Sequence, residues 1–451
     1  MSALRIAQVG TCDLDNLGDL LFPLALRALL DDLARERGVS IECVHFGPRG
    51  CAAGQLYPDQ PASLPLAEFE RHDAQAAFDL VFIGGGDLLR DDDASLGDVY
   101  PPGAAYLPYS YLLSPTADPA RRLVLLMPGA PFEINPALAE FLRNSFTRLC
   151  AAAVRDRITH ARLAPLLPAG LTLQVLPDCS AALAHYHPRA ALARELAAAL
   201  PAGFAAGGYI VFQSNPAYCP DPARTAALLR ELERRTGLPV LLLETGACLN
   251  DGALLDALAA RGFAYACRSG VLAKVAVIAA ARAFVGTSLH GNILAHAYGL
   301  PHFCFAGTEL DKLRGYFAGS GSGMLVDSLD ALALRIDEVA ALIAAAEPPT
   351  DAAQADWRAI RAFVAQALDS VPVVENAAGF SAAALLQYRA CQAQMLDAVL
   401  MQRASRKRLE ALGAELEQAR RNTDVALDGL RASTSWRITA PLRALRGWFG
   451  R

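Results

Sequence analysis

The sequence lacks several features that would assign a protein to a common class at once. Its ten cysteines are scattered and include no Cys-x-x-Cys pair, which fits reduced thiols better than a disulfide framework or a zinc site. No cluster of paired His or Cys residues indicates a metal, so we predict metal-free chemistry without a cofactor. The glycine-rich turns match neither a Walker loop nor a dinucleotide-binding fingerprint.

Charge and hydropathy exclude further classes. The net charge of −5 is spread along the chain, without the basic footprint of a nucleic-acid-binding protein. No uncharged apolar run reaches the roughly 18 residues that a membrane-spanning helix needs. Residues 1–10 lead almost at once into a predicted strand, which leaves no room for a signal peptide. We therefore expect a soluble, cytoplasmic protein with no nucleic-acid partner.

What is present is an alternation of strand-like and helix-like segments, typical of βαβ units with parallel sheets. The 451 residues are too many for one ordinary core. The alternation pauses near residues 185–188 and then restarts, which predicts an N-terminal α/β domain over 1–187 and a C-terminal α/β domain over 188–348. Strands are predicted at 6–9, 41–46, 80–83, 123–127, 152–155, 172–176, 209–213, 239–244, 283–286 and 301–306, and helices at 20–35, 136–149, 223–236, 254–260, 271–281 and 329–346.

The character of the chain changes after Pro348-Pro349, where residues 349–373 contain a predicted linking helix. Residues 381–430 hold no proline and only two glycines. An apolar heptad seam runs through them, interrupted at Gln402 and Ser405, and favours a long helix or a coiled coil. A coiled coil would make the protein an oligomer. A long helix lying on the globular body is the alternative.

The final segment, residues 431–451, contains five arginines and no acid, together with Trp436, Trp448 and Phe449. Basic, Trp-containing amphipathic segments suit the anionic cytoplasmic face of a membrane. We predict that this tail places the protein peripherally on the inner face of the plasma membrane. Docking of the tail on its own protein or on a partner is the alternative.

The most informative segment is residues 286–301, Gly-Thr-Ser-Leu-His-Gly-Asn-Ile-Leu-Ala-His-Ala-Tyr-Gly-Leu-Pro. Ser288 and His290 follow a predicted strand and open a helix. Open α/β sheets bind ligands at the carboxyl ends of their strands, and helix amides favour anions. The segment therefore predicts a binding or catalytic site, with a buried His bonded to a loop carbonyl as the alternative.

Four further motifs lie at or near the ends of predicted strands. They are Asn16-Leu17-Gly18-Asp19, Gly84-Gly85-Gly86-Asp87, Val154-Arg155-Asp156 and Pro177-Asp178. Glycine permits close backbone approach, while Asp19 could cap a helix. Asp87 and Asp178 could accept hydrogen bonds from sugar hydroxyls. Caps, tight turns and, for Arg155, a surface pair with Asp156 are the structural alternatives.

These five motifs, in this order, resemble the polysaccharide pyruvyl transferase family over roughly residues 5–320. The resemblance implies two doubly wound, Rossmann-like domains facing a cleft, the GT-B arrangement. It also implies transfer of a pyruvyl group from phosphoenolpyruvate onto two hydroxyls of a sugar, forming a ketal. The acceptor would be a glycan or a lipid-linked glycan precursor of a bacterial cell-surface polysaccharide. The Ser-x-Ser-Trp-Arg tail resembles tails of bacterial cell-surface glycosyltransferases.

The resemblance also implies roles for individual residues. His290 and Asp178 are the candidate catalytic residues, because the reaction needs a proton for the methylene carbon and a base for the attacking hydroxyls. A donor with a carboxylate and a phosphate needs cationic partners. The predicted donor-binding residues are Arg155, Ser288, Lys312, Arg314 and Asn292, and the predicted acceptor or loop residues are Asn16, Gly18, Asp19, Gly85, Gly86 and Asp87.

The sequence departs from the family at Ser288, where the family usually has Arg. Arg268 or Arg282 could compensate for its absence. The departure keeps two other functions open: a GT-B glycosyltransferase with a nucleotide-sugar donor, and a non-catalytic scaffold of the same fold.

Overall fold

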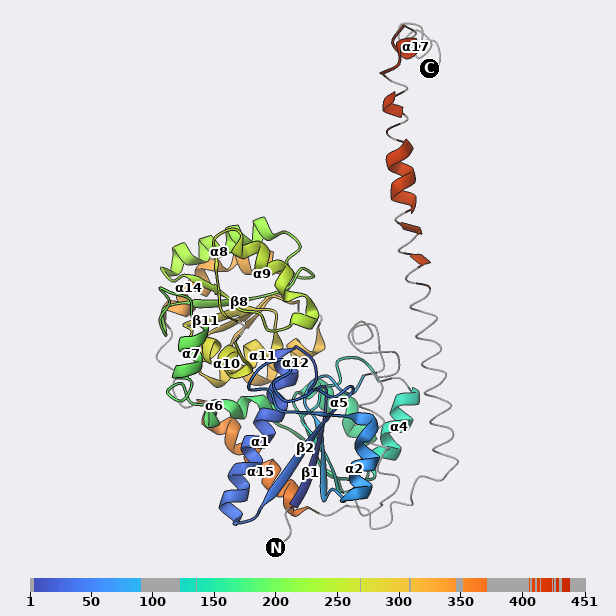
Figure 1. The fold of residues 1–451 in the computed structure, drawn as a ribbon, viewed down its shortest axis with the longest axis vertical. Helices are drawn as coiled ribbons and strands as arrows, with labels where there is room; N and C mark the ends of the chain where they lie inside the picture. Colours follow the sequence, from blue (N-terminus) through green and yellow to red (C-terminus); the bar gives the residue numbers. More distant parts are fainter. Residues whose placement is uncertain are drawn as a thin grey trace. The chain divides into compact units, whose positions relative to one another are not determined.

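The computed structural model describes residues 4–90, 122–134, 136–267, 269–307, 310–345 and 352–370, and much of 405–438. The chain forms two compact units, Met1–Ala384 and Leu385–Arg451. The first unit contains two parallel β-sheets with helices on their faces (Figure 1).

The first sheet has seven strands in the order β3-β2-β1-β4-β5-β6-β7, all paired in parallel. The strands are β1 (Leu4–Val9), β2 (Ile41–Gly47), β3 (Leu64–Pro65), β4 (Leu80–Gly84), β5 (Arg122–Leu126), β6 (Leu149–Val154) and β7 (Leu173–Val175). The strand order reverses between β1 and β4, and ligands bind in the crevice at such a reversal. The connecting helices are α1 (Leu17–Arg37), α2 (Phe69–Gln75), α4 (Pro136–Phe146) and α5 (Arg157–Leu163).

The second sheet has six strands in the order β10-β9-β8-β11-β12-β13 and reverses between β8 and β11. Its strands are β8 (Ile210–Gln213), β9 (Val240–Leu242), β10 (Ala264–Tyr265), β11 (Ala283–Gly286), β12 (His302–Cys304) and β13 (Met324–Leu325). In Figure 1 the helices α8 (Pro222–Thr236), α9 (Asp251–Ala259) and α14 (Ile336–Ala345) cover one face. The helices α10 (Val271–Ala279) and α11 (Leu289–Ala297) cover the face toward the first sheet.

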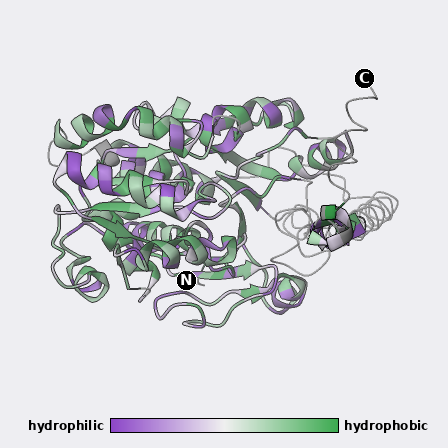
Figure 2. Ribbon diagram, turned by 90° about the horizontal axis from the view of Figure 1, so that it is seen from above, coloured by the Kyte–Doolittle hydropathy of each residue, from purple (hydrophilic) through white to green (hydrophobic). Residues whose placement is uncertain are grey.

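The central strands of both sheets are buried on both faces, as their near-continuous apolar sequences require. All residues of β4, β8 and β11 are buried. Viewed from above, the strands are mostly hydrophobic and the helices carry most hydrophilic residues (Figure 2). The sequence-based fold class, two doubly wound α/β domains, is confirmed.

Several predicted elements differ in detail, and the edge strands β3 and β10 were not predicted. The predicted strand through Met127 ends at Leu126, because Met127 has a φ of 54° that a strand cannot continue through. The predicted helix over 329–346 is two helices, α13 (Leu329–Leu334) and α14, separated at Arg335. The short edge strands β3 and β10 carry too few residues for an apolar pattern to show.

The predicted linking helix is α15 (Ala352–Asp369), and it packs on the N-terminal domain beside α1 (Figure 1). Arg361 pairs with Asp32 and Glu36 of α1. Arg37, in the last turn of α1, pairs with Asp369. One face of α15 is buried through Ile360, Phe363, Val364, Ala367 and Leu368. The chain thus crosses back to the first domain after completing the second.

The second unit contains helical residues between 405 and 438, with α17 over Thr434–Ile438. Among its described residues, the predicted seam positions Leu409, Leu412 and Leu416 are exposed. Residues 371–404 and 439–451, which include most of the predicted basic tail and part of the predicted long helix, lie outside the described residues. None of the helices in the described parts of the chain is long and apolar enough to cross a membrane. The predicted oligomer and membrane contacts stay predictions.

We expect Phe363→Ala to lower the free energy of unfolding by about 3–5 kcal/mol, because it empties a buried aromatic site between α15 and the first domain. Urea unfolding followed by circular dichroism measures the loss. Ala362→Ser, on the exposed face of the same helix, is the control and should cost little. Equal losses in the two variants would mean that α15 does not pack as described.

Candidate active site

The two α/β domains meet at the carboxyl ends of their strands. The loop after β1 contacts the loop after β9: Leu17 N donates to Thr245 O at 2.6 Å, and Cys248 N donates to Asp15 O at 3.2 Å. Asn16 forms an isolated β-bridge with Gly246, so this predicted site residue joins the domains through its backbone. Parallel strands of both sheets therefore direct their carboxyl ends into one region.

A second contact between the domains joins the loop after β2 to α10. The Asp59 carboxylate accepts hydrogen bonds from Val271 N at 2.8 Å and Leu272 N at 2.6 Å, which caps α10 from the other domain. Lys274, buried in α10, donates to Tyr57 Oη at 2.6 Å. These contacts hold the two domains together on one side of the site.

His290 is placed by a tightly bonded turn at the start of α11. The Ser288 hydroxyl accepts from Gly291 N at 3.1 Å, and the buried Asn292 amide donates to Ser288 O at 2.8 Å. The Ser288 backbone N donates to Gln213 Oε1 at 2.8 Å. In this structure Ser288 and Asn292, predicted to bind a donor, cap and brace the helix that carries His290.

The His290 ring reaches across to the N-terminus of α1. It lies edge-on to the Phe22 ring, with centroids 5.2 Å apart. A Cβ on Gly18 would overlap the imidazole, so only glycine leaves room for it. His290 Nε2 lies 3.6 Å from Asp178 Oδ2 and makes no hydrogen bond within the described residues. The imidazole thus faces a carboxylate rather than the loop carbonyl of the alternative interpretation.

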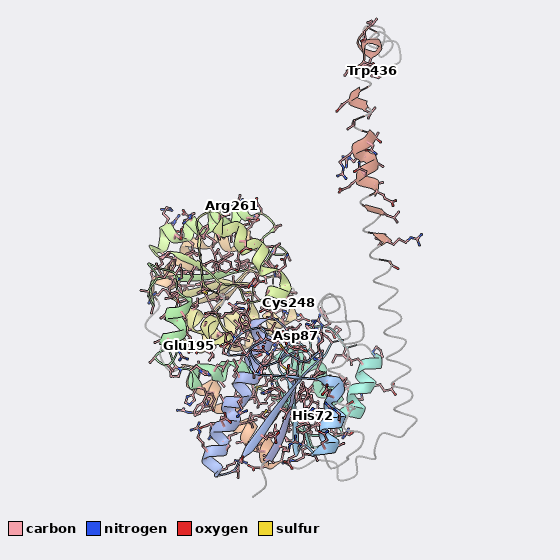
Figure 3. The ribbon with its side chains drawn as sticks, in the orientation of Figure 1. His72, Asp87, Glu195, Cys248, Arg261 and Trp436 are labelled. Carbon is pink, nitrogen blue, oxygen red and sulfur yellow. The ribbon has the colours of Figure 1, made fainter. Side chains whose placement is uncertain are left out.

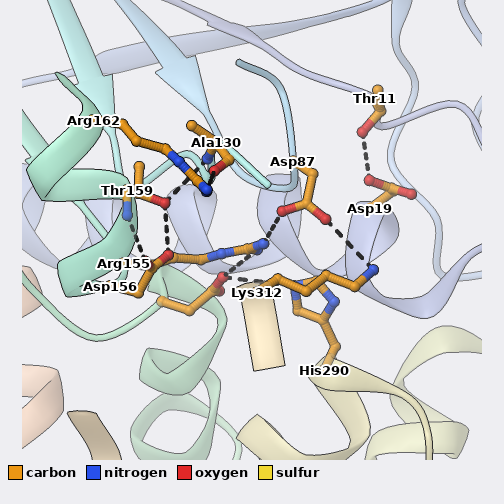
Figure 4. Close-up of polar contacts among 11 residues, drawn as sticks. Thr11, Asp19, Asp87, Ala130, Arg155, Asp156, Thr159, Arg162, His290 and Lys312 are labelled. Atoms are coloured by element: carbon orange, nitrogen blue, oxygen red, sulfur yellow. Dashed lines mark hydrogen bonds and ion pairs between the residues drawn. The ribbon is translucent and has the colours of Figure 1, made fainter. Parts of the chain in front are cut away.

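Asp178 belongs to a row of alternating charges (Figure 4). Arg155, just after β6, donates from Nη1 to Asp178 Oδ2 at 3.3 Å and from Nη2 to Asp87. Asp87 Oδ2 in turn lies 3.5 Å from Lys312 Nζ, a half-exposed ammonium at the start of α12 (Asp311–Ser320). The row ends at His290 on one side and at Lys312 on the other, and both ends belong to the second domain.

The alternative interpretation of Arg155 as a surface residue paired with Asp156 is wrong. Arg155 is 9% exposed, and Asp156 instead caps α5 by accepting from Thr159 N at 2.7 Å. A Cβ on Gly129 would crowd both Asp87 and Arg155. The turn at Gly129 therefore makes room for this buried ion pair. Sequence reasoning missed Gly129, although a glycine just after a predicted strand was a usable signal.

The charged groups in this row determine the protonation states of Asp178 and Asp87. Burial alone would raise the pKa of Asp178, but His290 and Arg155 together hold it well below its ordinary value. Burial opposes ionisation of Asp87 as well, and Arg155 and Lys312 lower its pKa. Both carboxylates are ionised at neutral pH. Asp178 can orient His290, but a carboxylate held so acidic is a weak base.

Asp19 stands apart from this row. Its carboxylate accepts a hydrogen bond from the Thr11 hydroxyl rather than capping α1. Burial raises the pKa of Asp19 to about 6, and the Thr11 hydrogen bond and the nearby His290 limit the increase. Thr11 was not foreseen from the sequence.

The glycines after β4 bring the two halves of the site close. Gly85 and Gly86 have φ values of 87° and 77°, which favour glycine. A Cβ on Gly85 would overlap Phe22, and one on Gly86 would lie 3.3 Å from Asp19 Oδ1. These predicted loop residues therefore let the segment that carries Asp87 approach α1.

Some predicted residues lie outside this cluster. Arg314 is paired with Asp311 and is mostly exposed. Arg282 donates to Ile343 O at 3.1 Å and braces α14, while Arg268 lies outside the described residues. No group of three or more His, Cys, Asp or Glu residues in the described ranges is arranged to hold a metal ion.

Five charged residues of this site fall within a match to a known family, whereas Thr11 and Lys312 lie outside the matched range. The sequence profile described as polysaccharide pyruvyl transferase matches residues 16–308, which contain Asp19, Asp87, Arg155, Asp178 and His290. The chain belongs to the polysaccharide pyruvyl transferase family. No curated protein sequence matches it significantly.

Solved structures with the same architecture are distant in sequence. UDP-GlcNAc 2-epimerase from Methanocaldococcus jannaschii has a TM-score of 0.50 at 10% identity, covering 80% of this chain and 99% of the epimerase. The enzyme from Neisseria meningitidis bound to UDP-GlcNAc has a TM-score of 0.50 at 11% identity, covering 81% and 99%. At these identities the similarity shows the shared two-domain, GT-B-like fold.

We expect Arg155→Gln to reduce stability mainly at neutral pH, because breaking a buried ion pair from one side costs about 3–5 kcal/mol. In the native protein the lowered pKa values of Asp87 and Asp178 contribute stability that is complete above the unfolded-state pKa of about 3.9. That contribution disappears as the pH falls through the lower folded-state values. The variant should lose this pH dependence in urea unfolding measured across acidic pH.

Arg314→Gln is the matched control, because it removes a mostly exposed Arg paired with Asp311. Exposed pairs contribute little, so its unfolding curve should follow that of the native protein at each pH. If the two variants behave alike, Arg155 does not hold a buried network together.

Proposed function

We propose that this family member transfers the pyruvyl group of phosphoenolpyruvate onto two hydroxyls of a sugar, forming a ketal and releasing phosphate. The acceptor would be a glycan or lipid-linked glycan of a bacterial cell-surface polysaccharide. The observation that carries the proposal is His290, whose Nε2 makes no hydrogen bond to the described residues and lies 3.6 Å from the ionised Asp178 at the carboxyl ends of both sheets. A histidine in such a position can give a proton to the methylene carbon of the donor.

The anionic donor needs cations, and Lys312 is the accessible one in this row. Its ammonium is 39% exposed and contacts Asp87, so it can turn toward a phosphate or carboxylate. Arg155, predicted as an anion clamp, is flanked by Asp87 and Asp178. The Arg155 side chain is only 4% exposed, so a donor would reach its guanidinium only after neighbouring groups move. We therefore assign Arg155 chiefly to ordering the carboxylates and Lys312 to contact with the donor.

A nucleotide-sugar donor remains the second candidate because of Ser288. The family usually has Arg at this position, and the serine here caps α11. Loss of a donor-binding Arg would favour a different donor. The distant Neisseria meningitidis structure is bound to UDP-GlcNAc, although at 11% identity it supports only the shared fold.

We expect phosphoenolpyruvate, rather than a UDP-sugar, to raise the melting temperature of the protein, because a ligand that binds only the folded state stabilises it by mass action. We further expect His290→Ala to lower phosphate release with a glycan acceptor by about 10²–10⁴-fold while the protein stays folded.

The control is His72→Ala in α2, a histidine that lies away from Asp87 (Figure 3); it should retain turnover. Stabilisation by a UDP-sugar alone would favour the second candidate. Near-native turnover of His290→Ala would remove His290 from the mechanism.

We also propose that the basic tail, residues 431–451, holds the enzyme at the cytoplasmic face of the membrane, where a lipid-linked acceptor would be available. In the described part of this tail, Trp436 and Ile438 are exposed. The sequence of residues 431–451 contains five arginines and no acid. Each basic residue near an anionic surface contributes about 1 kcal/mol.

Deletion after Gly429 should therefore abolish co-sedimentation with anionic vesicles while leaving turnover of a soluble acceptor unchanged. Neutral vesicles are the control, since they offer no electrostatic attraction. Equal sedimentation of the full-length and truncated proteins would favour a tail that docks on protein.

A further inference from the structure

Ketal formation from phosphoenolpyruvate moves two protons, and the inference developed here rests on that proposed reaction. The methylene carbon gains one proton and becomes a methyl group. Two acceptor hydroxyls each lose a proton as their oxygens bond to the central carbon. One hydroxyl proton replaces the proton given to the methylene carbon, and the other leaves on the released phosphate. A group that donates at carbon and a separate group that accepts from oxygen are therefore both needed.

His290 can serve as the donor, and three carboxylates surround it as possible acceptors. Asp178 and Asp87 are both held by Arg155, and Asp87 also by Lys312. Their affinity for a proton is correspondingly low. Neither is suited to take a proton from an alcohol.

Asp19 differs from both in its partner. It accepts a hydrogen bond from the neutral hydroxyl of Thr11, and among the described residues it forms no ion pair with Lys or Arg. Asp19 as a whole residue is 8% exposed. Burial raises its pKa to about 6, which is suited to gaining and losing a proton near neutral pH.

The backbone places Asp19 close to both His290 and Asp87. Gly18, its neighbour in sequence, lies against the His290 ring, and Gly86, the neighbour of Asp87, lies against the Asp19 carboxylate. In Figure 4 Asp19 and Thr11 lie on the side of Asp87 opposite Arg155. A sugar hydroxyl near Asp87 and His290 would therefore have Asp19 within the same small region.

We propose that Asp19 is the general base that accepts the proton of the attacking acceptor hydroxyl, with Thr11 as the residue that positions its carboxylate. A lone pair of the hydroxyl oxygen forms the bond to the central carbon, the electrons of the O–H bond stay on that oxygen, and the proton passes to Asp19. The phosphate leaves with the electron pair of its C–O bond. The proton on Asp19 then returns to solvent or to the leaving phosphate, which restores the carboxylate.

The titration of Asp19 is influenced by groups from several elements. His290 on α11 favours its ionised form, whereas Asp87 after β4 and Asp13 after β1 oppose it. Cys12 and Cys248 also face it, and burial raises the pKa of both thiols, so they are uncharged. Turnover that depends on ionised Asp19 should therefore rise with pH through about 6.

The test uses Asp19→Asn in the full chain, with phosphate release and phosphoenolpyruvate binding measured separately. Asparagine keeps the shape and can still accept from Thr11, so the fold and the donor dissociation constant should be unchanged. We expect kcat to fall by about 10²–10⁴-fold. Native kcat, or a raised KM for the acceptor with native kcat, would overturn the proposal.

Thr11→Val gives a second, independent measurement. The Thr11 hydroxyl lowers the pKa of Asp19, so its removal should raise that pKa and move the acidic limb of the kcat profile to higher pH. A merely structural hydrogen bond would change stability without moving this limb. An acidic limb that stays in place would overturn the proposal.

Measurements on the native protein distinguish failure of the proposed reaction from failure of the Asp19 assignment. If it neither binds phosphoenolpyruvate nor releases phosphate with any glycan acceptor, the proposed reaction itself is wrong. If it turns over and Asp19→Asn turns over equally well, only the assignment of Asp19 fails.

Discussion

The guanidinium of Arg155 is buried at the carboxyl end of β6 and needs carboxylates to offset its lost hydration. It contacts two of them. Asp87 follows β4 and Asp178 follows β7, so one side chain joins the ends of three strands of the first sheet. The second domain completes the row, with His290 beside Asp178 and Lys312 beside Asp87. The charged groups of the site thus depend on the contact between the two domains.

Close backbone approach is the second constraint. Gly18 leaves room for the His290 ring, and Gly129 leaves room for the Arg155–Asp87 pair. Gly18 lies in the first turn of α1 and Gly129 in the loop after β5, and a side chain at either would separate groups that now touch. The site therefore depends on glycines, which leave room for neighbouring groups, as much as on charged side chains.

Contacts away from the site also hold distant elements of the chain together. Asp59 caps α10 across the interface, and α15 packs against α1 with Arg361 paired to Asp32. Arg162 of α5 pairs with Asp311 at the start of α12, next to Lys312. Each contact joins elements far apart in sequence, so no local sequence pattern identifies the partner of either residue.

The sequence by itself determined the two doubly wound domains, because buried parallel strands need continuous apolar runs and their helices need a 3.6-residue pattern. It also placed Asp19, Asp87, Arg155, Asp178 and His290 at strand ends, since such motifs are local. Only the tertiary structure decided which of these touch. In the folded protein, Ser288 and Asn292 cap and brace α11. Arg314 lies outside the row of charges, and Thr11 donates a hydrogen bond to Asp19. Those outcomes depend on burial and on distances between loops of different strands, which no single segment of the chain encodes.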